Sequence, residues 1–275
     1  MTFIIYHNPD CGTSRNTLAL LQSVGVDPSV VEYLQTPPSR AELADLVRRM
    51  GLAVRDVIRQ KGTPYAALEL DDPSLGDEAL LEAMVAHPIL INRPIVVSPN
   101  GVRLCRPSDI VFDLLPPGVT SELLKEEGVP FLVDERVTGD DPRLLSALQS
   151  AALPIDDLTE PGRTFFAYRT SAGQLIGYGG YEALGENVLL RSIVVLPEAR
   201  SKAVGRNLVA LLQRRAFDEG ARRAWVLTSS ATSFFEKVGF KPVSRGDAPA
   251  TVLATRQATS LCPADAALLA RTIRF

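Results

Sequence analysis

The 275-residue sequence predicts a chain of two α/β domains joined by a short polar segment. Three observations predict this class. The length suits two domains of ordinary size better than one. Segments with the alternating period of strands are interspersed with segments of helical period, and this series starts twice along the chain. Between the two series, Pro116-Pro117-Gly118 interrupts the pattern and the polar stretch 121–128 follows, so we expect the linker there.

The first half begins with an apolar strand at 3–6, a turn over His7-Asn8-Pro9-Asp10 and a helix at 13–24. Ser39 and Glu42 have the spacing of a capping box at the start of a second helix. The further elements are expected as a strand at 30–33, helical segments at 39–50, 54–59 and 77–86, strands at 89–91, 95–98 and 102–104, and a helix at 107–115. The order β-α-β, helices, β-β-α predicts a thioredoxin-type core with a helical insert.

The second half starts again with a strand at 130–137, and Asp140-Asp141-Pro142 caps the helix that follows. Turns at 171–173 and 185–187 separate three strands into hairpins. The further elements are expected as strands at 164–170, 174–182 and 188–195, a strong amphipathic helix at 203–219, a strand at 224–228, a short helix at 233–238 and a strand at 242–245. This half is therefore a second, mixed α/β domain.

Composition excludes several classes of protein. A hydrophobic fraction of 46% with 22% charged residues is that of a globular protein. No apolar run is long enough for a membrane helix and the start has no signal-peptide pattern, so we expect no membrane partner and a cytoplasmic location. A net charge of −3 predicts no nucleic-acid partner. Three widely spaced cysteines, two histidines and no Cys-x-x-Cys argue for a reducing compartment and against a metal site.

Cys11 stands where a strand and turn give way to a helix, a position that favours a thiolate. The helix dipole and the free backbone N–H groups of the first turn lower the pKa of a thiol there. His7 and Arg15 are expected to add positive charge. Small and hydroxyl-bearing neighbours, including Ser14, suit a bound oxyanion better than a packed core. The alternative is an inert buried cysteine, which is the commonest fate of a lone thiol.

Four segments in order resemble the glutaredoxin-coupled arsenate reductase family over residues 1 to about 116. They are His7-Asn8-Pro9-Asp10-Cys11-Gly12-Thr13-Ser14-Arg15-Asn16-Thr17, Val57-Ile58-Arg59-Gln60-Lys61-Gly62-Thr63-Pro64-Tyr65, His87-Pro88-Ile89-Leu90-Ile91-Asn92-Arg93-Pro94-Ile95-Val96 and Leu104-Cys105-Arg106-Pro107-Ser108. The resemblance also implies a cis peptide bond before Pro94.

The resemblance implies a mechanism for these residues. Arg59, Arg93 and Arg106 would form a cradle for arsenate, since planar guanidinium groups suit a tetrahedral oxyanion. Cys11 would attack arsenic to give a thiol–arsenate adduct. Glutathione would then attack the adduct and glutaredoxin would resolve the mixed disulfide, so arsenite is released without a second active-site cysteine.

The arginines, Cys105 and the segment around Cys11 also have other interpretations. Each arginine taken singly is more often a solvated surface charge. Cys105 alternates with Arg106 and is expected to face the core. A related class of transcription regulators with no reductase activity uses Cys-x-x-Cys as its switch, and Ser14 occupies the second position of that pattern here.

A second resemblance begins at the end of the strand at 188–195. The segment Leu196-Pro197-Glu198-Ala199-Arg200-Ser201-Lys202-Ala203-Val204-Gly205-Arg206 resembles the pyrophosphate-binding motif of the GNAT acetyltransferases. Its loop and helix N-terminus would cradle the pyrophosphate of acetyl-CoA. We therefore expect this cofactor to contact the loop, with candidate residues Val195, Arg200, Lys202, Ala203, Val204, Gly205 and Arg206. Ala203 stands where glycine is usual.

The segment Ser233-Phe234-Phe235-Glu236-Lys237-Val238-Gly239-Phe240 resembles a later GNAT segment, with one departure. Phe235 stands where many members have a tyrosine that protonates the departing CoA thiolate, and phenylalanine cannot donate a proton. Ser230, Thr232 or water could substitute, or the fold could be kept for binding. Glu182 and Glu186 are candidate general bases near the central strands, although an ordinary strand-edge or turn charge is the commoner role for such residues.

Leu153-Pro154-Ile155-Asp156-Asp157-Leu158 and Ser260-Leu261-Cys262-Pro263-Ala264 resemble arsenic-resistance N-acetyltransferase-like proteins. Pro263 fits the first position of a helix reaching about Arg271, with Cys262 as its N-cap. A thiol there would favour the thiolate, so Cys262 is a candidate ligand of trivalent arsenic. A small buried hydrophobe is the alternative for this residue.

Taken together, the sequence predicts an arsenate reductase domain at 1–118, a linker at 119–128 and a GNAT-like domain at 129–275. Arsenate, glutathione, glutaredoxin and acetyl-CoA are the expected substrates and partners. The alternative is an acetyl-CoA-dependent N-acetyltransferase, or an arsenite- or acyl-CoA-binding module, with a vestigial reductase half. The acceptor of the second domain stays open, and a homodimer stays open as the oligomeric state.

Overall fold

A computed structural model describes residues 2–200 and 203–275 and divides the chain into two compact units. Unit 1 extends to Phe131 and includes Phe275, and unit 2 is Leu132–Arg274. In the part of the chain that is described, no helix is both long and apolar enough to cross a membrane. The expected linker bounds, 119 and 128, stay a prediction.

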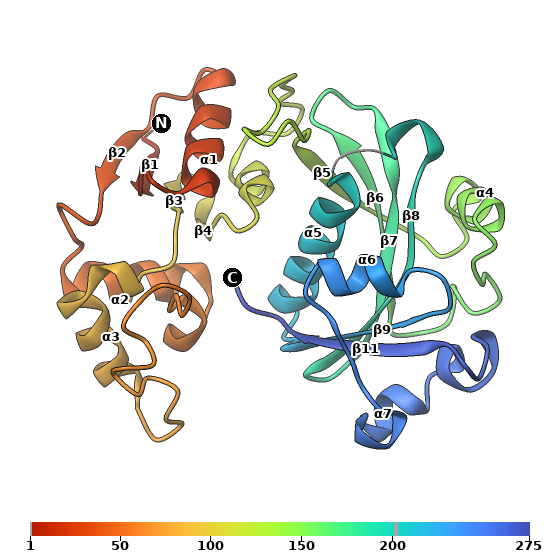
Figure 1. The fold of residues 1–275 in the computed structure, drawn as a ribbon. Coiled ribbons are helices and arrows are strands. Elements are labelled where there is room, and N and C mark those ends of the chain that lie inside the picture. Colours follow the sequence, from red (N-terminus) through yellow and green to blue (C-terminus); the bar gives the residue numbers. More distant parts are fainter. Residues whose placement is uncertain (1, 201–202) are drawn as a thin grey trace. The chain divides into compact units, whose positions relative to one another are not determined.

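Unit 1 is a four-stranded sheet with helices on both faces (Figure 1). The strand order is β2-β1-β3-β4, in which β1 and β2 are parallel and β3 is antiparallel to both of its neighbours. This is the thioredoxin-like arrangement that the sequence predicts. The elements are β1 (Ile4–His7), α1 (Gly12–Ser23), β2 (Ser29–Glu32), α2 (Arg40–Met50), α3 (Asp77–Ala86), β3 (Ile95–Ser98) and β4 (Gly101–Leu104).

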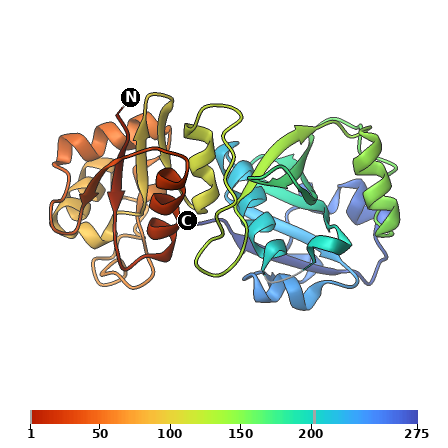
Figure 2. The same ribbon diagram turned by 90° about the horizontal axis from the view of Figure 1, so that it is seen from above.

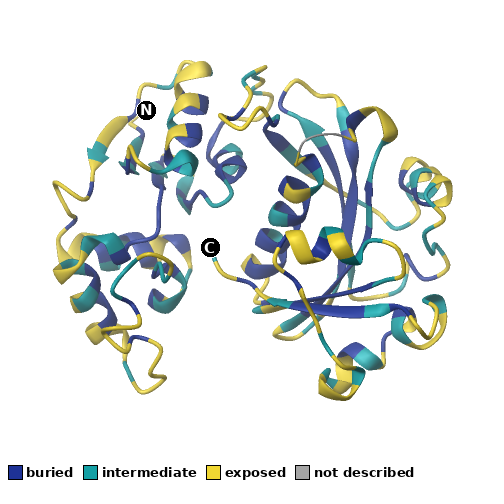
Figure 3. Cartoon of the chain, in the orientation of Figure 1, coloured by how far each residue is buried: buried dark blue, intermediate teal, exposed yellow. Residues whose placement is uncertain are grey.

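The alternation of side chains along the strands builds two cores, one on each face of this sheet (Figure 3). Ile5 and Val96 point to the face covered by α1, where they join Leu20 and Leu21. The opposite face carries Ile95 and the apolar side chains of α2 and α3. The sheet is therefore buried on both sides, and the ends of its strands are left for polar chemistry.

Local signals account for most of the elements of unit 1. The capping box at Ser39 and Glu42 is present and begins α2 as predicted. The segments predicted as helical at 54–59 and 107–115 are 3₁₀ turns at Val54–Val57 and Ser108–Leu114. The strand predicted at 89–91 is wrong, because Pro88–Leu90 forms a 3₁₀ turn and only Ile91 pairs, with Ile58.

The expected linker segment lies against α1 within unit 1. Lys125 is buried and donates to the buried carboxylate of Asp109 at 2.5 Å. The backbone N–H of Glu126 donates to the Asn16 side chain at 2.9 Å, and Glu127 accepts from the same side chain at 3.1 Å. These contacts fix 125–127 on the surface of the first unit.

Unit 2 is a seven-stranded sheet with helices on both faces (Figures 1 and 2). The strand order is β10-β11-β9-β8-β7-β6-β5, and β8–β9 is its parallel pair. The elements are β5 (Leu132–Val137), α4 (Pro142–Ser150), β6 (Arg163–Thr170), β7 (Leu175–Leu184), β8 (Asn187–Val195), α5 (Val204–Asp218), β9 (Arg223–Thr228), α6 (Thr232–Lys237), β10 (Lys241–Pro242), α7 (Ala250–Leu253) and β11 (Ala267–Thr272).

The central strands of unit 2 separate at one end. The pairing of β8 with β9 runs from Asn187 opposite Arg223 to Leu190 opposite Val226, and in the described chain β8 continues beyond it to Val195. On the other side of β8, a bulge opposite Gly179 leaves Ser192 with a positive φ of 53°. Gly179 lets α5 approach the sheet, because a Cβ there would lie 3.0 Å from Leu208. The sheet therefore opens beside the start of α5.

The helix predicted after Pro263 is wrong. Residues 267–272 form β11, which pairs with β9 from Ala267 opposite Thr228 to Thr272 opposite Arg223. Alanine and leucine favour helix locally, but pairing with a central strand buries Leu268 and Leu269, and this tertiary interaction overrides the local preference.

Candidate active site

Cys11 is the N-cap residue of α1 and lies at the end of a tight turn that follows β1. Its backbone N–H donates to the Asn8 carbonyl at 3.0 Å, and the Asn8 side chain accepts from Asp10 N–H at 2.9 Å. The Cys11 carbonyl accepts the Arg15 N–H at 3.0 Å, which begins the helix. The half-buried thiol therefore sits at the free N–H groups of the first turn.

The pKa of Cys11 is lowered from its ordinary value of 9.0. Burial by itself would raise the pKa of the thiol, but the Ser14 N–H, the Arg106 and Arg93 guanidinium groups and the Ser14 hydroxyl together outweigh it. Ser14 is fully buried one turn into α1. The structure thus brings together Cys11, Ser14, Arg93 and Arg106, four of the predicted site residues.

Arg93 and Arg106 reach this site from the two ends of the β3–β4 hairpin. Arg106 donates from Nη1 to the Arg93 carbonyl at 3.1 Å, so the backbone of one arginine positions the side chain of the other. Each arginine precedes a cis proline, and the bond before Pro94 was predicted. The burial of Arg106 lowers its pKa from the ordinary value, and the charge of Cys11 opposes this shift.

Arg93 is buried without hydrogen-bond partners for two of its nitrogens. The residue is 5% exposed, and within the described chain Nε and Nη1 have no acceptor. Leaving charged donors buried and unpaired is costly. An oxyanion seated beside Cys11 would supply the acceptors that these donors lack.

Of two supporting predictions at this site, the one for His7 needs correction. His7 is buried at the end of β1, and burial lowers its pKa below 6.5, so it is neutral at pH 7 and adds no charge. Arg15 is engaged with Glu126, which accepts from Nε at 2.6 Å and from Nη2 at 2.8 Å. Arg15 nevertheless keeps an electrostatic interaction with Cys11, so its supporting part stays a prediction.

Arg59, the third predicted arginine, lies on the segment beside Arg93. Its N–H donates to the Leu90 carbonyl at 2.7 Å, and Asn92 N–H donates to the Val57 carbonyl at 2.9 Å, so 57–59 runs antiparallel to 90–92. Its guanidinium lies over Gly62. The backbone places Arg59 next to the strand that carries Arg93, and its part in the cradle stays a prediction.

Tyr33 belongs to this site and was not singled out from the sequence. It is fully buried after β2, and its hydroxyl donates to the Ile91 carbonyl at 3.3 Å. Burial raises the pKa of Tyr33 to about 12, and its electrostatic neighbours are Arg93, Cys11 and Arg106. The parallel pairing of β1 with β2 would have indicated this position, because the two strands end at the same edge of the sheet.

The predicted acyl-CoA loop in unit 2 leads into the N-terminus of α5. Ala203, the N-cap residue, has a φ of 70°, in the left-handed region where glycine is usual, and its own side chain makes no capping hydrogen bond. Gly205 lets Phe234 approach, since a Cβ at this position would lie 3.3 Å from the phenyl ring. Arg200 donates from Nε to the Val195 carbonyl at 3.0 Å. Lys202 lies outside the described residues.

A cavity of about 580 Å³ extends from this loop to the point where β8 and β9 separate. Val195, Arg200 and Gly205 line it near the loop, and Leu190 and Val226 line it where the strand pairing ends. Phe235 also lines the cavity and packs edge-on against Phe240 with ring centroids 5.5 Å apart. Ser230, but not Thr232, is among the lining residues described, which leaves Ser230 as the closer hydroxyl to replace the missing tyrosine.

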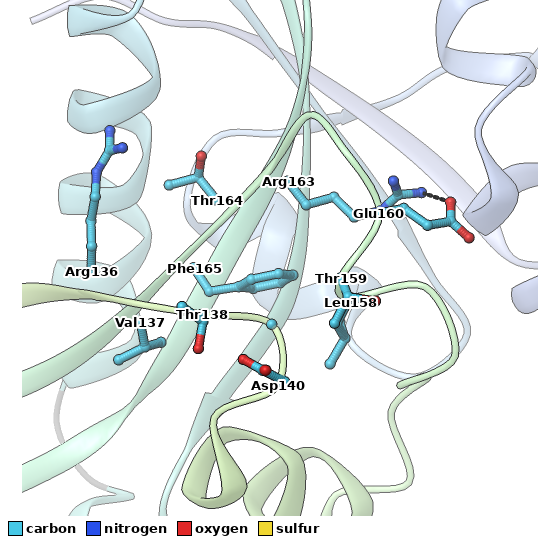
Figure 4. A pocket seen from close by; sticks show the side chains of 11 residues that line it. Arg136, Val137, Thr138, Asp140, Leu158, Thr159, Glu160, Arg163, Thr164 and Phe165 are labelled. Atoms are coloured by element: carbon cyan, nitrogen blue, oxygen red, sulfur yellow. Dashed lines mark ion pairs between the residues drawn. The ribbon is translucent and has the colours of Figure 1, made fainter.

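A second cavity, of about 510 Å³, lies between the end of β5, the start of β6 and the loop at 158–160 (Figure 4). Both of its cations are already held by carboxylates. Arg163 pairs with Asp157 and Glu160, each at 3.0 Å, and Arg136 pairs with Glu219. A phosphate-bearing ligand needs free cations or N–H groups, so this cavity suits acyl-CoA less well than the one beside α5.

Asp157 is the centre of a buried ion-pair network. It is fully buried and accepts from Arg191 at 2.7 Å and from Arg163. Burial would raise the pKa of Asp157, but the two arginines lower it from 3.8. Glu182, a predicted general base, lies 3.6 Å from Arg163 and 3.7 Å from Arg191. Its carboxylate therefore faces this network.

Cys262 does not cap a helix. It follows a π-helical turn, Gln257–Leu261, and packs half-buried against an apolar cluster that includes Val252. The helix-dipole argument for a thiolate at this residue is therefore lost. Cys105 is fully buried, as predicted, and lies 3.7 Å from the Arg103 carbonyl.

These features define a class of protein. Its first unit is thioredoxin-like and carries an oxyanion site built around a thiol, and its second unit has an acyltransferase-type fold. Residues 6–113 match the ArsC family, and residues 131–240 match the acetyltransferase (GNAT) family. An arsenate reductase of Rhizobium meliloti is 60% identical over 128 residues, which is 46% of this chain and 91% of that protein. An Escherichia coli arsenate reductase is 48% identical over 141 residues, or 51% of this chain and 96% of the relative.

Among solved structures, an arsenate reductase from Vibrio cholerae is 47% identical, covers 42% of this chain and 98% of its own, and has a TM-score of 0.41. A GNAT-family acetyltransferase from Staphylococcus aureus is 17% identical over 52% of this chain and all of its own, with a TM-score of 0.38. The chain belongs to the ArsC family through its first unit and carries a GNAT domain in its second.

Proposed function

We propose that unit 1 reduces arsenate to arsenite. The observation that carries the proposal is the pair of buried, unpartnered Arg93 nitrogens beside a thiol of lowered pKa. Arsenate offers oxygens on every side of a tetrahedral centre, so it satisfies these donors while placing arsenic close to sulfur. The names of the relatives support the same substrate.

In the first step, the Cys11 thiolate attacks arsenic, a sulfur–arsenic bond forms, and one arsenate oxygen leaves as water after protonation. Arg93 and Arg106 neutralise the oxyanion, which removes its repulsion of the thiolate. The Ser14 N–H and the two guanidinium groups favour the anionic form of the sulfur. Arg59, on the adjacent segment, would contribute a third guanidinium to the cradle.

The electrons for arsenic reduction come from thiols outside the chain. Cys105 is fully buried in unit 1, so it offers no accessible second thiol to the adduct. Glutathione attacks the adduct, glutaredoxin resolves the mixed disulfide, and two thiols become a disulfide as As(V) becomes As(III). This chemistry requires reduced thiols, which supports a cytoplasmic location.

The test is arsenate-dependent NADPH oxidation by the full chain with glutathione, glutaredoxin and glutathione reductase. We expect Cys11→Ser to abolish turnover, because no nucleophile remains. Arg93→Ala should lower kcat/KM by about 100-fold, as loss of a donor to a developing oxyanion does elsewhere. Replacing glutaredoxin with thioredoxin should stop the cycle.

Cys105→Ser and Cys262→Ser are the matched thiol controls, and both should retain turnover. Wild-type rates in Cys11→Ser would refute the proposal. Cys262 remains a candidate thiol for the arsenite product. Unchanged arsenite binding in Cys262→Ser would end that assignment.

For unit 2 we propose binding of acyl-CoA and acyl transfer to an amine, supported by the cavity beside α5. The N-terminus of α5 supplies N–H groups for the pyrophosphate, and the separated strands leave room for the pantetheine arm.

Calorimetry with acetyl-CoA tests the binding of acyl-CoA to unit 2. Gly205→Val should weaken binding at least about tenfold, because Phe234 fills the space a side chain needs, whereas Gly185→Ala, in a distant turn, should not. Equal binding by Gly205→Val would contradict the assignment.

A further inference from the structure

Gln257 is a buried residue on the wall of the cavity beside α5, and among the described residues its side-chain carbonyl oxygen has no hydrogen-bond partner. The residue is 7% exposed and lines the cavity together with Leu153, Leu190 and Phe235. Within the described residues, its Oε1 atom is buried and accepts no hydrogen bond. Since a buried carbonyl oxygen left unsatisfied is destabilising, this atom marks a place where a ligand N–H would bind.

No described residue that lines this cavity could serve as the counter-ion of a cation. Its described lining residues include no aspartate or glutamate, and its charged members are the cations Arg191 and Arg200. Arg191 is bound by Asp157, and Glu182 lies beside Arg191 and Arg163. A protonated alkylamine would therefore lose its hydration without gaining a counter-ion.

From the unpartnered amide and the acid-free, largely apolar wall, we propose that the acceptor of unit 2 is a primary arylamine, bound through its N–H to Gln257. This inference rests on the proposed acyl-CoA binding of unit 2. An arylamine is uncharged at neutral pH because its lone pair is delocalised into the ring, so it needs no general base before attack. Its flat apolar ring suits walls made of Leu153, Leu190 and Phe235.

The reaction balances with the groups present. The amine nitrogen attacks the acetyl carbonyl carbon, a carbon–nitrogen bond forms, and the carbon–sulfur bond of the thioester breaks. The nitrogen loses one proton and the departing CoA thiolate takes up one, giving an N-aryl acetamide and free CoA. Once the carbon–nitrogen bond has formed, the nitrogen carries a positive charge and is acidic, so the exposed Ser230 or water can pass its proton to sulfur. Phe235 therefore does not block this transfer.

The experiment compares aniline with benzylamine as acceptors for the full chain and acetyl-CoA at neutral pH, with acetanilide and N-benzylacetamide measured by chromatography. We expect wild type to prefer aniline. Gln257→Ala should lower kcat/KM for aniline by about fivefold, the value of one neutral hydrogen bond. Gln257→Glu, which is isosteric but anionic, should reverse the preference in favour of benzylamine. The exposed Gln174→Ala is the matched control and should behave as wild type.

Two binding measurements separate the possible failures. Calorimetry with acetyl-CoA alone tests the proposed function, and the Gln174→Ala control should bind it as wild type does. Calorimetry with acetanilide, without CoA, tests the acceptor site directly, and Gln257→Ala should weaken it. If acetyl-CoA binds but benzylamine is used as well as aniline, or neither is used, or Gln257→Ala has no effect, the arylamine proposal is overturned while acyl-CoA binding stands.

Discussion

The Cys11 side chain combines two opposing influences on its ionisation. Its half-buried position favours the neutral thiol, whereas Ser14 N–H and the two arginines favour the thiolate. The second influence is the larger, so the net pKa lies below 9.0. The thiolate is the form that attacks arsenic, and its population therefore sets the rate of the first step.

We expect the alkylation rate of Cys11 by iodoacetamide to rise with pH through a midpoint below 9.0. Below the midpoint the thiol is protonated and unreactive, and above it the rate is constant. Arg106→Gln should raise the midpoint, because it removes a positive charge near sulfur. The measurement uses a Cys262→Ser background, since Cys105 is buried and does not react in the folded protein.

His7→Gln is the matched control, because His7 is neutral and should leave the midpoint unchanged. A midpoint at or above 9.0 in the wild type would show that burial, and not the arginines, dominates at this sulfur.

Residue chemistry at this site could be predicted only in part from the sequence. The sequence predicted the position of Cys11 at a helix start and the arginines of the later motifs. Both predictions depend on residues that lie near one another in the chain. The pairing of Arg15 with Glu126 was not, since these residues are 111 positions apart. Tyr33 was missed although the parallel pairing of β1 with β2 would have indicated it, because that pairing brings the ends of both strands to one edge of the sheet.

The segment 125–127 shows how a polar, linker-like stretch can be a fixed structural element. Its composition predicts a linker, and Lys125 is buried against Asp109 and lies 5.3 Å from the centre of the Phe131 ring. The helix predicted after Pro263 was wrong, because β11 forms there instead. In both segments a tertiary partner, and not local propensity, decides the structure.

We expect Lys125→Met to lower the free energy of unfolding of unit 1 by about 3 kcal/mol, because it leaves the fully buried Asp109 carboxylate without its cation. Adding Asp109→Leu should restore most of this loss, since the pair is then replaced by apolar groups. Urea unfolding followed by far-UV circular dichroism measures both variants. If Lys125→Met alone leaves the stability unchanged, the ion pair does not hold the segment against the 3₁₀ turn Ser108–Leu114.

Each unit has its own sheet and its own cores, so each should unfold and bind ligand on its own account. The chain provides a separate reporter for each. Trp225, the one tryptophan of the sequence, is fully buried in β9 of unit 2. Cys105 is fully buried in unit 1, and it becomes the one thiol of the chain when Cys11 and Cys262 are both changed to serine.

In that double serine variant, urea unfolding should give one transition in Trp225 fluorescence and another in the labelling of Cys105. Acetyl-CoA at 100 times its Kd should stabilise the Trp225 transition by about 2.7 kcal/mol and leave the Cys105 transition in place. Arsenate should do the reverse, because Arg93 and Arg106 still bind the oxyanion when sulfur is absent. A ligand binding one unit can stabilise the other only through free energy that couples them. Equal shifts of both transitions by either ligand would therefore show that the two activities are energetically linked.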